Sequence, residues 1–316
     1  GKLSRGLGDV YKRQVAGCVA QAEGKEITKR SPWVDLVVGP QAYTDLPKLL
    51  KKIKEDSKKK EINLKFPEIP KFDLLNFDKK ISKVSDFVTI QEGCDKFCSF
   101  CVVPFTRGPE YSRSRKSILD EIKIMAQNGV KEIILLGQNV NSWKDDTNVS
   151  KAYTLGHLIE DIAKIDEILS IRYTTSHPLD MNLELIKAHK NVDKLMPYLH
   201  LPIQSGSDNI LKKMNRRHTA SEYLKIIELV RKHCENIAIS SDFIVGHPGE
   251  TNEDHKKTLD IINEVQFASS YSFMYSERPG TKSSEFGEIV DDNIKKIRLH
   301  AVSYTHLTLP TSGGVG

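Results

Sequence analysis

Long apolar runs are missing from this sequence of 316 residues, since none approaches the roughly 18 consecutive residues that a membrane-spanning helix needs. The basic first segment, residues 1–14, is not followed by the apolar stretch of a signal peptide. Both absences argue against an integral membrane protein and against a secreted one. We therefore expect a cytoplasmic protein that does not bind membranes.

Cysteines are few and the net charge is low. The five cysteines are an odd number in a chain far longer than the small secreted domains that depend on disulfides, which favours metal or redox chemistry. Lysine and arginine number 47 against 42 aspartate and glutamate, and the net charge of +5 allows an anionic partner without requiring one. With 39% hydrophobic residues, the chain can bury a proper core.

The sequence does contain a regular alternation of short apolar runs and helical patterns. The runs resemble parallel strands that are buried on both faces, and they lie at Phe87–Gln91, Glu132–Leu136, Ser170–Thr175, Tyr198–Leu201, Ile237–Val245 and Tyr271–Tyr275. Capping-box pairs mark the starts of two helices between them, Thr219 with Glu222 and Thr251 with Asp254. Six such units predict an α/β fold, a partial (β/α)6 barrel whose active site lies at the C-terminal ends of its strands.

The segments around this core, which we predict at residues 81–300, have a different character. Residues 15–80 predict an incomplete α/β domain and a linker, with a strand at Val34–Val38 and one helix face formed by Leu46, Leu49, Leu50 and Ile53. The flanks, residues 1–14 and 301–316, break the pattern of the chain between them. We expect them to be foreign to the gene, which the native genomic locus would test.

Three cysteines lie close together directly after the first predicted barrel strand, in the run Cys94-Asp95-Lys96-Phe97-Cys98-Ser99-Phe100-Cys101. Three thiolates can hold a four-iron cluster and leave one iron open for a small-molecule ligand, as a catalytic cluster needs. The alternative is a structural zinc site in a nucleic-acid-binding module without catalysis. Zinc requires a fourth ligand, usually from a second cysteine or histidine pair, and the sequence offers none, so the cluster is the favoured interpretation.

The cysteine spacing, with Phe100 before the last cysteine, resembles the radical S-adenosylmethionine (SAM) superfamily. Within it, GCDKFCSFCVVPFTRGPEYSR is similar to the methylthiotransferase family, which VAGCVAQAEG, VDLVVGPQ, LLGQNVNSW, TTSHP, LHLPIQSGSDNIL, SSDFIVGHPGET and YSFMYSERPGT match in type and order. The segment from Gln138 to Asn141 favours the branch that modifies dimethylallyladenosine in tRNA over those that modify threonylcarbamoyladenosine or a ribosomal-protein aspartate. His247 replaces a usual aromatic residue, and Asn215 a common glycine.

The resemblance implies that residues at the strand ends bind SAM. Those after the second strand would hold its methionine part, and those on later strands would line the ribose and adenine or pair with the carboxylate. Taken singly, each has a plainer explanation as a turn former, a buried hydrogen-bonding group or a surface cation. The implied cofactor-binding set is Gly137, Gln138, Ser176, Gln204, Arg216, Ile244 and Gly246, with Asn139 and Asn141 beside it.

The same resemblance implies a second four-iron cluster in the N-terminal domain, through which sulfur is delivered. Cys18 matches the last of its three cysteine ligands, so the implied metal ligands are Cys18, Cys94, Cys98 and Cys101. Because the first two cysteines of the second set and the family's C-terminal RNA-binding barrel are absent, we expect this chain alone not to be a complete enzyme. Cys234 is expected to be a packing residue.

The activity that the resemblance implies is methylthio transfer to C2 of the modified adenosine at position 37 of tRNA, with two molecules of SAM. The implied partners are SAM, the anticodon stem-loop of tRNA and an electron donor such as a flavodoxin-type reductant, and we expect a monomer. Arg278 either meets the RNA or closes the pocket. A set of basic residues is as compatible with phosphate contacts as with ordinary surface charge: Arg107, Arg113, Arg115, Lys116, Lys212, Lys213, Arg216 and Arg217.

Overall fold

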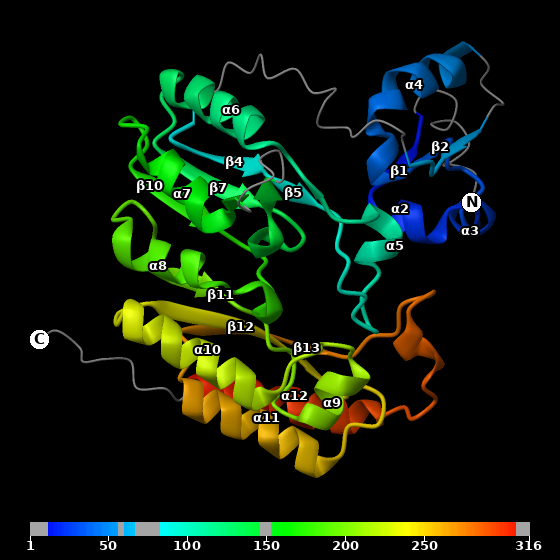
Figure 1. The fold of residues 1–316 in the computed structure, drawn as a ribbon. Helices are drawn as coiled ribbons and strands as arrows, with labels where there is room; N and C mark the ends of the chain where they lie inside the picture. Colours follow the sequence, from blue (N-terminus) through cyan, green and yellow to red (C-terminus); the bar gives the residue numbers. More distant parts are fainter. Residues whose placement is uncertain (1–11, 56–59, 67–82, 146–152, 308–316) are drawn as a thin grey trace, which may run out of the picture. The chain divides into compact units, whose positions relative to one another are not determined.

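The computed structural model describes residues 12–55, 60–66, 83–145 and 153–307 (Figure 1). Its contacts divide the chain into two compact units. The N-terminal unit comprises the described part of residues 1–78 together with residues 102–109, and the barrel unit comprises the described part of residues 79–101 and 110–316. In this described part, no helix has the length and apolar character of a membrane span.

Six parallel strands form the framework of the barrel unit, and they follow one another in sequence order. The first three pair as one sheet, β4 (Ser85–Thr89), β7 (Glu132–Leu136) and β10 (Ser170–Tyr173). The last three pair as another, β11 (Tyr198–His200), β12 (Ala238–Val245) and β13 (Ser269–Met274). An isolated parallel bridge between Ile171 and Leu195 connects β10 to the segment before β11. The predicted partial (β/α)6 barrel is thereby confirmed.

Helices cover the outer side of these strands (Figure 1): α6 (Arg115–Gln127), α7 (Leu155–Ala163), α8 (Leu183–Asn191), α10 (Ala220–His233), α11 (Asn252–Val265) and α12 (Asp292–Leu307). Both predicted capping boxes are present. The hydroxyl of Thr219 accepts a hydrogen bond from the backbone N–H of Glu222, and that of Thr251 accepts one from Asp254. These caps satisfy N–H groups that a helix start leaves unpaired.

Strands β7 and β10 bury alternate residues, which differs from the prediction of burial on both faces, whereas β12 buries Ile239, Ser240 and Ser241 in succession. In β7, Ile133 and Leu135 are fully buried in the core, whereas the other three residues of the strand are half-buried. The other face carries polar side chains, since Glu132 accepts hydrogen bonds from Ser85 at 2.8 Å and Ser170 at 3.0 Å.

Helix α12 does not end at His300, where the foreign flank was predicted to begin. It continues to Leu307, and Val302 is fully buried in the core. Val302 lies three positions after Leu299, which packs against the same core, so the apolar face of the helix extends into the flank. Residues 1–11 and 308–316, the rest of the predicted flanks, lie outside the described residues.

Shorter elements complete the barrel unit. Two antiparallel pairs form beside the strand ends, β5 (Gln91–Glu92) with β6 (Tyr111–Ser112) and β8 (Lys144–Asp145) with β9 (Tyr153–Thr154). The short helices are α9 (Asp208–Lys213), η3 (Val140–Ser142), η4 (Pro178–Asp180) and η5 (Lys282–Glu285).

The N-terminal unit contains a parallel sheet in the order β1 (Gln14–Ala16), β2 (Leu36–Val38) and β3 (Glu61–Asn63). Its helices are α2 (Cys18–Glu23), α3 (Lys25–Arg30), η1 (Pro40–Asp45), α4 (Leu46–Glu55) and α5 (Val103–Arg107). The predicted strand and the predicted apolar face of α4 both occur, with Leu49 and Ile53 buried. Strand β3 was missed because it lies in the stretch predicted as linker.

Candidate functional site

Cys94, Cys98 and Cys101 lie on the loop after β4 and β5, at the C-terminal end of the first barrel strand. All three thiols are half-buried. Burial raises the pKa of the Cys94 thiol to about 12, and the charges of Glu110 and the other two cysteines add to the increase. A thiolate here is therefore costly unless a positively charged metal centre binds it.

The spacing of the side chains bears on the choice between zinc and a cluster. Among the residues that the structure describes, no three histidine, cysteine or carboxylate side chains converge closely enough to bind a single metal ion. Zinc needs its ligands around one centre, whereas the cysteines of a four-iron cluster each bind a different iron. The three cysteines on this loop match the number of protein ligands of a four-iron cluster that keeps one iron open.

Two amide side chains fasten the start of this loop, which we call the cluster loop (residues 93–101). The Gln138 side chain accepts a hydrogen bond from the backbone N–H of Gly93 at 2.8 Å. Gln91 accepts from the N–H groups of Gln138 and Asn139 and donates to the carbonyl of Gly93. A β carbon on Gly137 would lie 2.7 Å from Oε1 of Gln91, so glycine is needed for this close approach. The roles of Gly137 and Gln138 toward methionine stay predictions.

The segment between α9 and α10 holds the middle of the cluster loop. The Asn215 side chain donates to the carbonyl of Phe97 at 2.8 Å, and Nη1 of Arg216 lies 3.5 Å from the sulfur of Cys98. Asn215 has a φ of 58°, in the left-handed region that asparagine and glycine tolerate best. Arg216 is only 4% exposed, so its interpretation as a surface or RNA-contacting cation is wrong.

The ends of β7 and β10 are joined by polar contacts. Asn141 donates to the carbonyl of His177 at 2.9 Å and accepts from its N–H at 2.8 Å. The hydroxyl of Thr175 donates to the carbonyl of Gly137 at 2.7 Å. Ser176 is buried between these contacts. The structure thus brings together the residues predicted after the second and third strands, with Asn141 holding the two strand ends together.

Two buried histidines, His177 and His218, were not singled out from the sequence. Their rings meet edge to face, with 5.9 Å between centroids. Burial lowers the pKa of both, that of His218 to about 4, and the charge of Arg216 adds to the decrease in each. Both rings are therefore neutral at pH 7, so these two buried side chains are polar but carry no charge. The TTSHP motif was the available signal for His177.

A cavity of about 320 Å³ opens at the ends of the last strands, and its lining residues are Phe100, Gln204, Asp242, Ile244, Phe273, Met274, Tyr275, Ser276 and Arg278. Gln204 and Ile244 were predicted here, and their backbones pair at 2.9 Å. Asp242 and Phe273 were missed, although their place on the predicted strands was a usable signal. Asp242 also lies 3.5 Å from Nε2 of His200.

Gly246 does not line this cavity but shapes the turn after β12. Its φ is 71°, and a β carbon would lie 2.4 Å from Cγ of Lys295. Its N–H donates to Glu250, which Arg298 pairs with at 2.8 Å. Burial raises the pKa of Glu250 to about 6, although the guanidinium of Arg298 opposes this increase.

Several buried polar atoms of the described chain lack a hydrogen-bond partner, and many of them surround the cluster loop: Ser99 Oγ, Asn139 Oδ1, Ser176 Oγ, His177 Nε2, Arg216 Nε and His218 Nε2. Buried polar atoms are normally bonded, so this concentration fits a polar ligand at the strand ends. Three thiols on one loop, unpaired polar atoms and an adjoining cavity together fit an iron–sulfur cluster with a small-molecule ligand.

Cys18 belongs to the N-terminal unit, where it begins α2 directly after Gly17. Nε of Arg107, on α5 of the same unit, lies 3.3 Å from its sulfur. Arg107 comes six positions after Cys101 in the sequence, yet its contacts place it in the N-terminal unit. The sequence did not reveal this contact, and the expected role of Arg107 toward RNA stays a prediction. Cys234, as predicted, packs against the barrel core.

Other members of the predicted basic set are also engaged. Arg113 is 3% exposed, donates to the carbonyl of Thr89 at 2.7 Å and pairs with Glu121 at 2.7 Å, so its expected phosphate contact is wrong. It directly follows Ser112, which pairs with Gln91 of β5. Lys116, in contrast, has a side chain that is 89% exposed.

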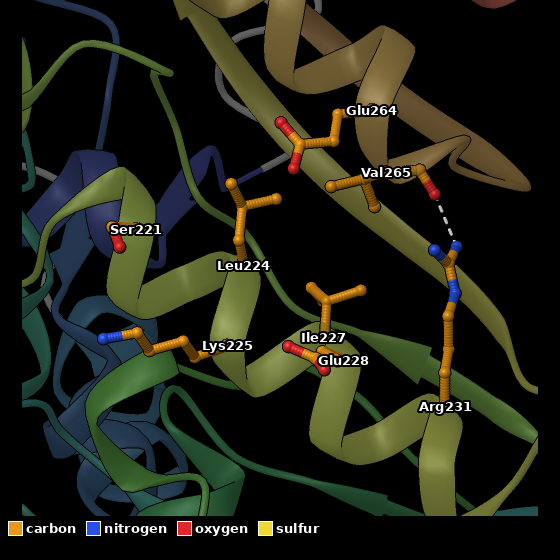
Figure 2. Close-up of a pocket in the computed structure, with 8 residues that line it drawn as sticks. All are labelled: Ser221, Leu224, Lys225, Ile227, Glu228, Arg231, Glu264 and Val265. Atoms are coloured by element: carbon orange, nitrogen blue, oxygen red, sulfur yellow. Dashed lines mark hydrogen bonds between the residues drawn. The ribbon is translucent and has the colours of Figure 1, made fainter.

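A second cavity, of about 420 Å³, lies between α10 and the end of α11 (Figure 2). Leu224, Ile227 and Glu228 line it from α10, and the side chain of Arg231 donates to the carbonyl of Val265 across it. None of its lining residues comes from a strand end, so it is separate from the cluster loop and its cavity.

Comparison with known proteins identifies relatives of this chain. The model of the radical SAM superfamily matches residues 88–262. A tRNA-2-methylthio-N(6)-dimethylallyladenosine synthase of Anaplasma marginale is 52% identical over 295 residues, which cover 93% of this chain and 64% of the relative. One of the same name from Ehrlichia ruminantium (strain Welgevonden) is 53% identical over 308 residues, 94% of this chain and 69% of the relative. The chain thus spans about two thirds of these relatives' length.

Solved structures show the same fold at low sequence identity. The cobalamin-dependent SAM radical enzyme OxsB aligns with a TM-score of 0.58 and 14% identity, over 90% of this chain and 43% of that one. Coproporphyrinogen III oxidase from Escherichia coli aligns with a TM-score of 0.50 and 16% identity, over 70% of this chain and 51% of that one. The fold, the family model and the relatives agree: the chain belongs to the radical SAM superfamily and, within it, to the family of the tRNA-2-methylthio-N(6)-dimethylallyladenosine synthases.

Proposed function

We propose that the protein to which this chain belongs transfers a methylthio group to C2 of N6-dimethylallyladenosine at position 37 of tRNA. The observation that carries the proposal is the cluster loop, with three thiols held at the C-terminal end of the first barrel strand. The superfamily uses a [4Fe–4S] cluster and SAM. The tRNA substrate rests on the names of the relatives.

In this proposal Cys94, Cys98 and Cys101 bind three irons of the cluster. With SAM and an electron from a flavodoxin-type donor, the cluster that these cysteines would hold would supply 5′-deoxyadenosyl radical chemistry. The protein's part is to orient the ligand and exclude water. Phe100 and Ile244 give the cavity beside the loop apolar walls, and the unpaired hydroxyl of Ser176 is available to a polar group of SAM.

Cys18 would help to hold a second cluster, which would supply the sulfur of the methylthio group once one SAM has supplied its methyl. The guanidinium of Arg107, which lies within hydrogen-bond distance of the Cys18 sulfur, is suited to stabilise negative charge there. We further propose that the anticodon stem-loop is the part of tRNA that binds and that the protein acts as a monomer in the cytoplasm.

Two cysteine substitutions in the full-length protein, reconstituted anaerobically with iron and sulfide, separate these roles. Cys98→Ala should abolish formation of 5′-deoxyadenosine and lower the iron content. Cys18→Ala should retain most 5′-deoxyadenosine formation but lose methylthiolated tRNA, whereas Cys234→Ala is the matched control and should retain both. Equal losses in the Cys98 and Cys18 variants would contradict the proposed division of roles.

The substrate is tested by mass spectrometry of tRNA nucleosides from a host that lacks its own enzyme and carries the full-length gene. The proposal expects 2-methylthio-N6-dimethylallyladenosine. A methylthiolated threonylcarbamoyladenosine, or unchanged tRNA with a modified ribosomal-protein aspartate, would assign the protein to another branch. A colourless anaerobic preparation with stoichiometric zinc would support the binding-module alternative instead.

A further inference from the structure

Lys96 lies between the first two cysteines of the cluster loop and is held by a carboxylate from a distant strand end. Its Nζ lies 2.8 Å from Oδ1 of Asp180, which ends η4 just after β10. Each of the two side chains is 19% exposed, so the pair is largely withdrawn from water. An ion pair in such a place is less screened by salt than one at the surface.

The other oxygen of Asp180 extends this contact. Oδ2 accepts a hydrogen bond from the side chain of Asn139 at 2.7 Å, and the same nitrogen lies 3.1 Å from Oε1 of Glu110. Glu110 in turn exchanges backbone-to-carboxylate contacts with Asp95, at 3.3 and 3.4 Å. Asp180 therefore reaches Lys96 directly, whereas Asn139 reaches Asp95 through Glu110, and the contact between Asp180 and Asn139 joins the two paths.

The backbone next to Lys96 needs such support. Phe97 has a φ of 51°, in the left-handed region that a residue with a side chain enters at a cost in free energy. Asn215 holds the carbonyls of Lys96 and Phe97 from one side, at 3.3 and 2.8 Å. Asp180 holds the side chain of Lys96 from the other. The backbone and the side chain of Lys96 are thus held by two different segments.

We propose that Asp180 is a positioning residue, which acts through Lys96 to keep Cys94 and Cys98 in the arrangement that accepts the iron–sulfur cluster. This inference rests on the proposed cluster site. Half-buried ion pairs contribute little net stability, because desolvation offsets their attraction, and their best-supported use is to select one arrangement over others. The contact is therefore suited to fixing the geometry of the loop more than to stabilising the fold.

The first test uses the protein without its cluster. Hydrogen exchange measured by mass spectrometry on peptides covering residues 93–101 should be about tenfold faster in Asp180→Ala, since one charge-assisted hydrogen bond is lost. Lys96→Met should match it, and the double variant should exceed either by no more than about twofold. Asp120→Ala is the matched control, because it removes a carboxylate 3.3 Å from Lys116 on the exposed face of α6 and should leave the cluster loop unchanged.

The second test uses the full-length protein with iron and sulfide restored. Asp180→Ala should release iron to a chelator about tenfold faster and should change the electron paramagnetic resonance spectrum of the reduced cluster when SAM is added. The thermal midpoint should stay close to that of the wild type. Asp180→Asn is of equal size and keeps an oxygen for Lys96, so its rate of iron release should lie between those of the wild type and Asp180→Ala. This variant keeps the inference testable even if the alanine variant fails to fold.

Wild-type exchange and wild-type iron release in both Asp180 variants would overturn the inference. So would additive effects in the double variant, because Asp180 would then act other than through Lys96. A lowered thermal midpoint with an unchanged spectrum would reduce Asp180 to a structural residue. Failure of the proposed cluster site is a separate outcome, since the wild type itself would then bind no iron and sulfide.

Discussion

Replacing His247 with phenylalanine tests how the barrel unit accommodates a polar ring in an apolar place. His247 is fully buried, and its ring contacts Tyr275 and Phe286 at centroid distances of 5.3 and 6.0 Å. Neither ring nitrogen has a hydrogen-bond partner of good geometry. Burial lowers its pKa from 6.5 to about 4, and the backbone of Pro248 opposes only part of this decrease.

The size of the effect follows from these contacts. Removing unpaired buried polar atoms should raise the free energy of unfolding by about 1–2 kcal/mol at pH 7.5. Because the folded-state pKa lies below the ordinary value, the unfolded chain binds more protons between pH 6.5 and 4, and the wild type loses stability as the pH falls through this range. At pH 5 this loss is about 2 kcal/mol, and phenylalanine avoids it, so the variant should gain about 3–4 kcal/mol there.

Tryptophan fluorescence during urea unfolding can measure this difference in the barrel unit. The sequence has two tryptophans, of which Trp143 is 1% exposed in the barrel core and Trp33 is 59% exposed in the N-terminal unit. A Trp33→Phe background leaves Trp143 as the reporter. Phe286→Leu is the control, because it alters packing at the same ring without removing a titratable group, and its cost should be equal at pH 7.5 and pH 5.

Two results would refute this reasoning. An equal gain for His247→Phe at both pH values would show that the ring is not held neutral by burial. A loss of more than about 1 kcal/mol at pH 7.5 would show that the nitrogens have partners or that phenylalanine overfills the site.

Three further predictions concern the barrel unit and use the same unfolding measurement. Thr219→Ala removes the cap of α10 and should lower the free energy of unfolding by about 1 kcal/mol. An unchanged urea midpoint would mean that the hydroxyl contact does not stabilise the helix. Gly246→Ala should cost at least about 1–2 kcal/mol, since alanine is strained at a φ of 71° and its β carbon would meet Lys295; a neutral effect would contradict the turn geometry. Arg298→Met leaves Glu250 buried and unpaired and should cost about 3–5 kcal/mol at pH 8. Because loss of the guanidinium raises the pKa of Glu250 further above about 6, that loss should diminish as the pH falls from 8 towards 6, and Glu250→Gln in the same chain should recover most of it.

The barrel could be predicted from the sequence because its signals are local. A strand of parallel type shows itself as a short apolar run, and Thr219 and Thr251 mark helix starts through contacts only three residues away. Strand β3 escaped because its three residues, Glu61–Asn63, pair with β2 from within a charged stretch. Its existence depends on a partner more than twenty residues away, which no local pattern reveals.

The candidate site was predictable in its ligands but not in its supports. Spacing alone singled out Cys94, Cys98 and Cys101, since metal chemistry depends on residue type and separation along one loop. Arg113 and Arg216 illustrate the opposite case, because an arginine has the same letter whether it meets phosphate or lies buried against Glu121 or Cys98. Burial is a property of the whole fold.

The sequence by itself determined the alternation of strands and helices, the three thiols of the cluster loop and the family to which the chain belongs. Tertiary structure alone decided that Asp180 meets Lys96 and that Asn139 joins them, across 84 and 41 positions of the chain. The physical reason is that covalent neighbours and helical periods act over a few residues. Hydrogen bonds between strand ends exist only after the barrel has brought distant segments together.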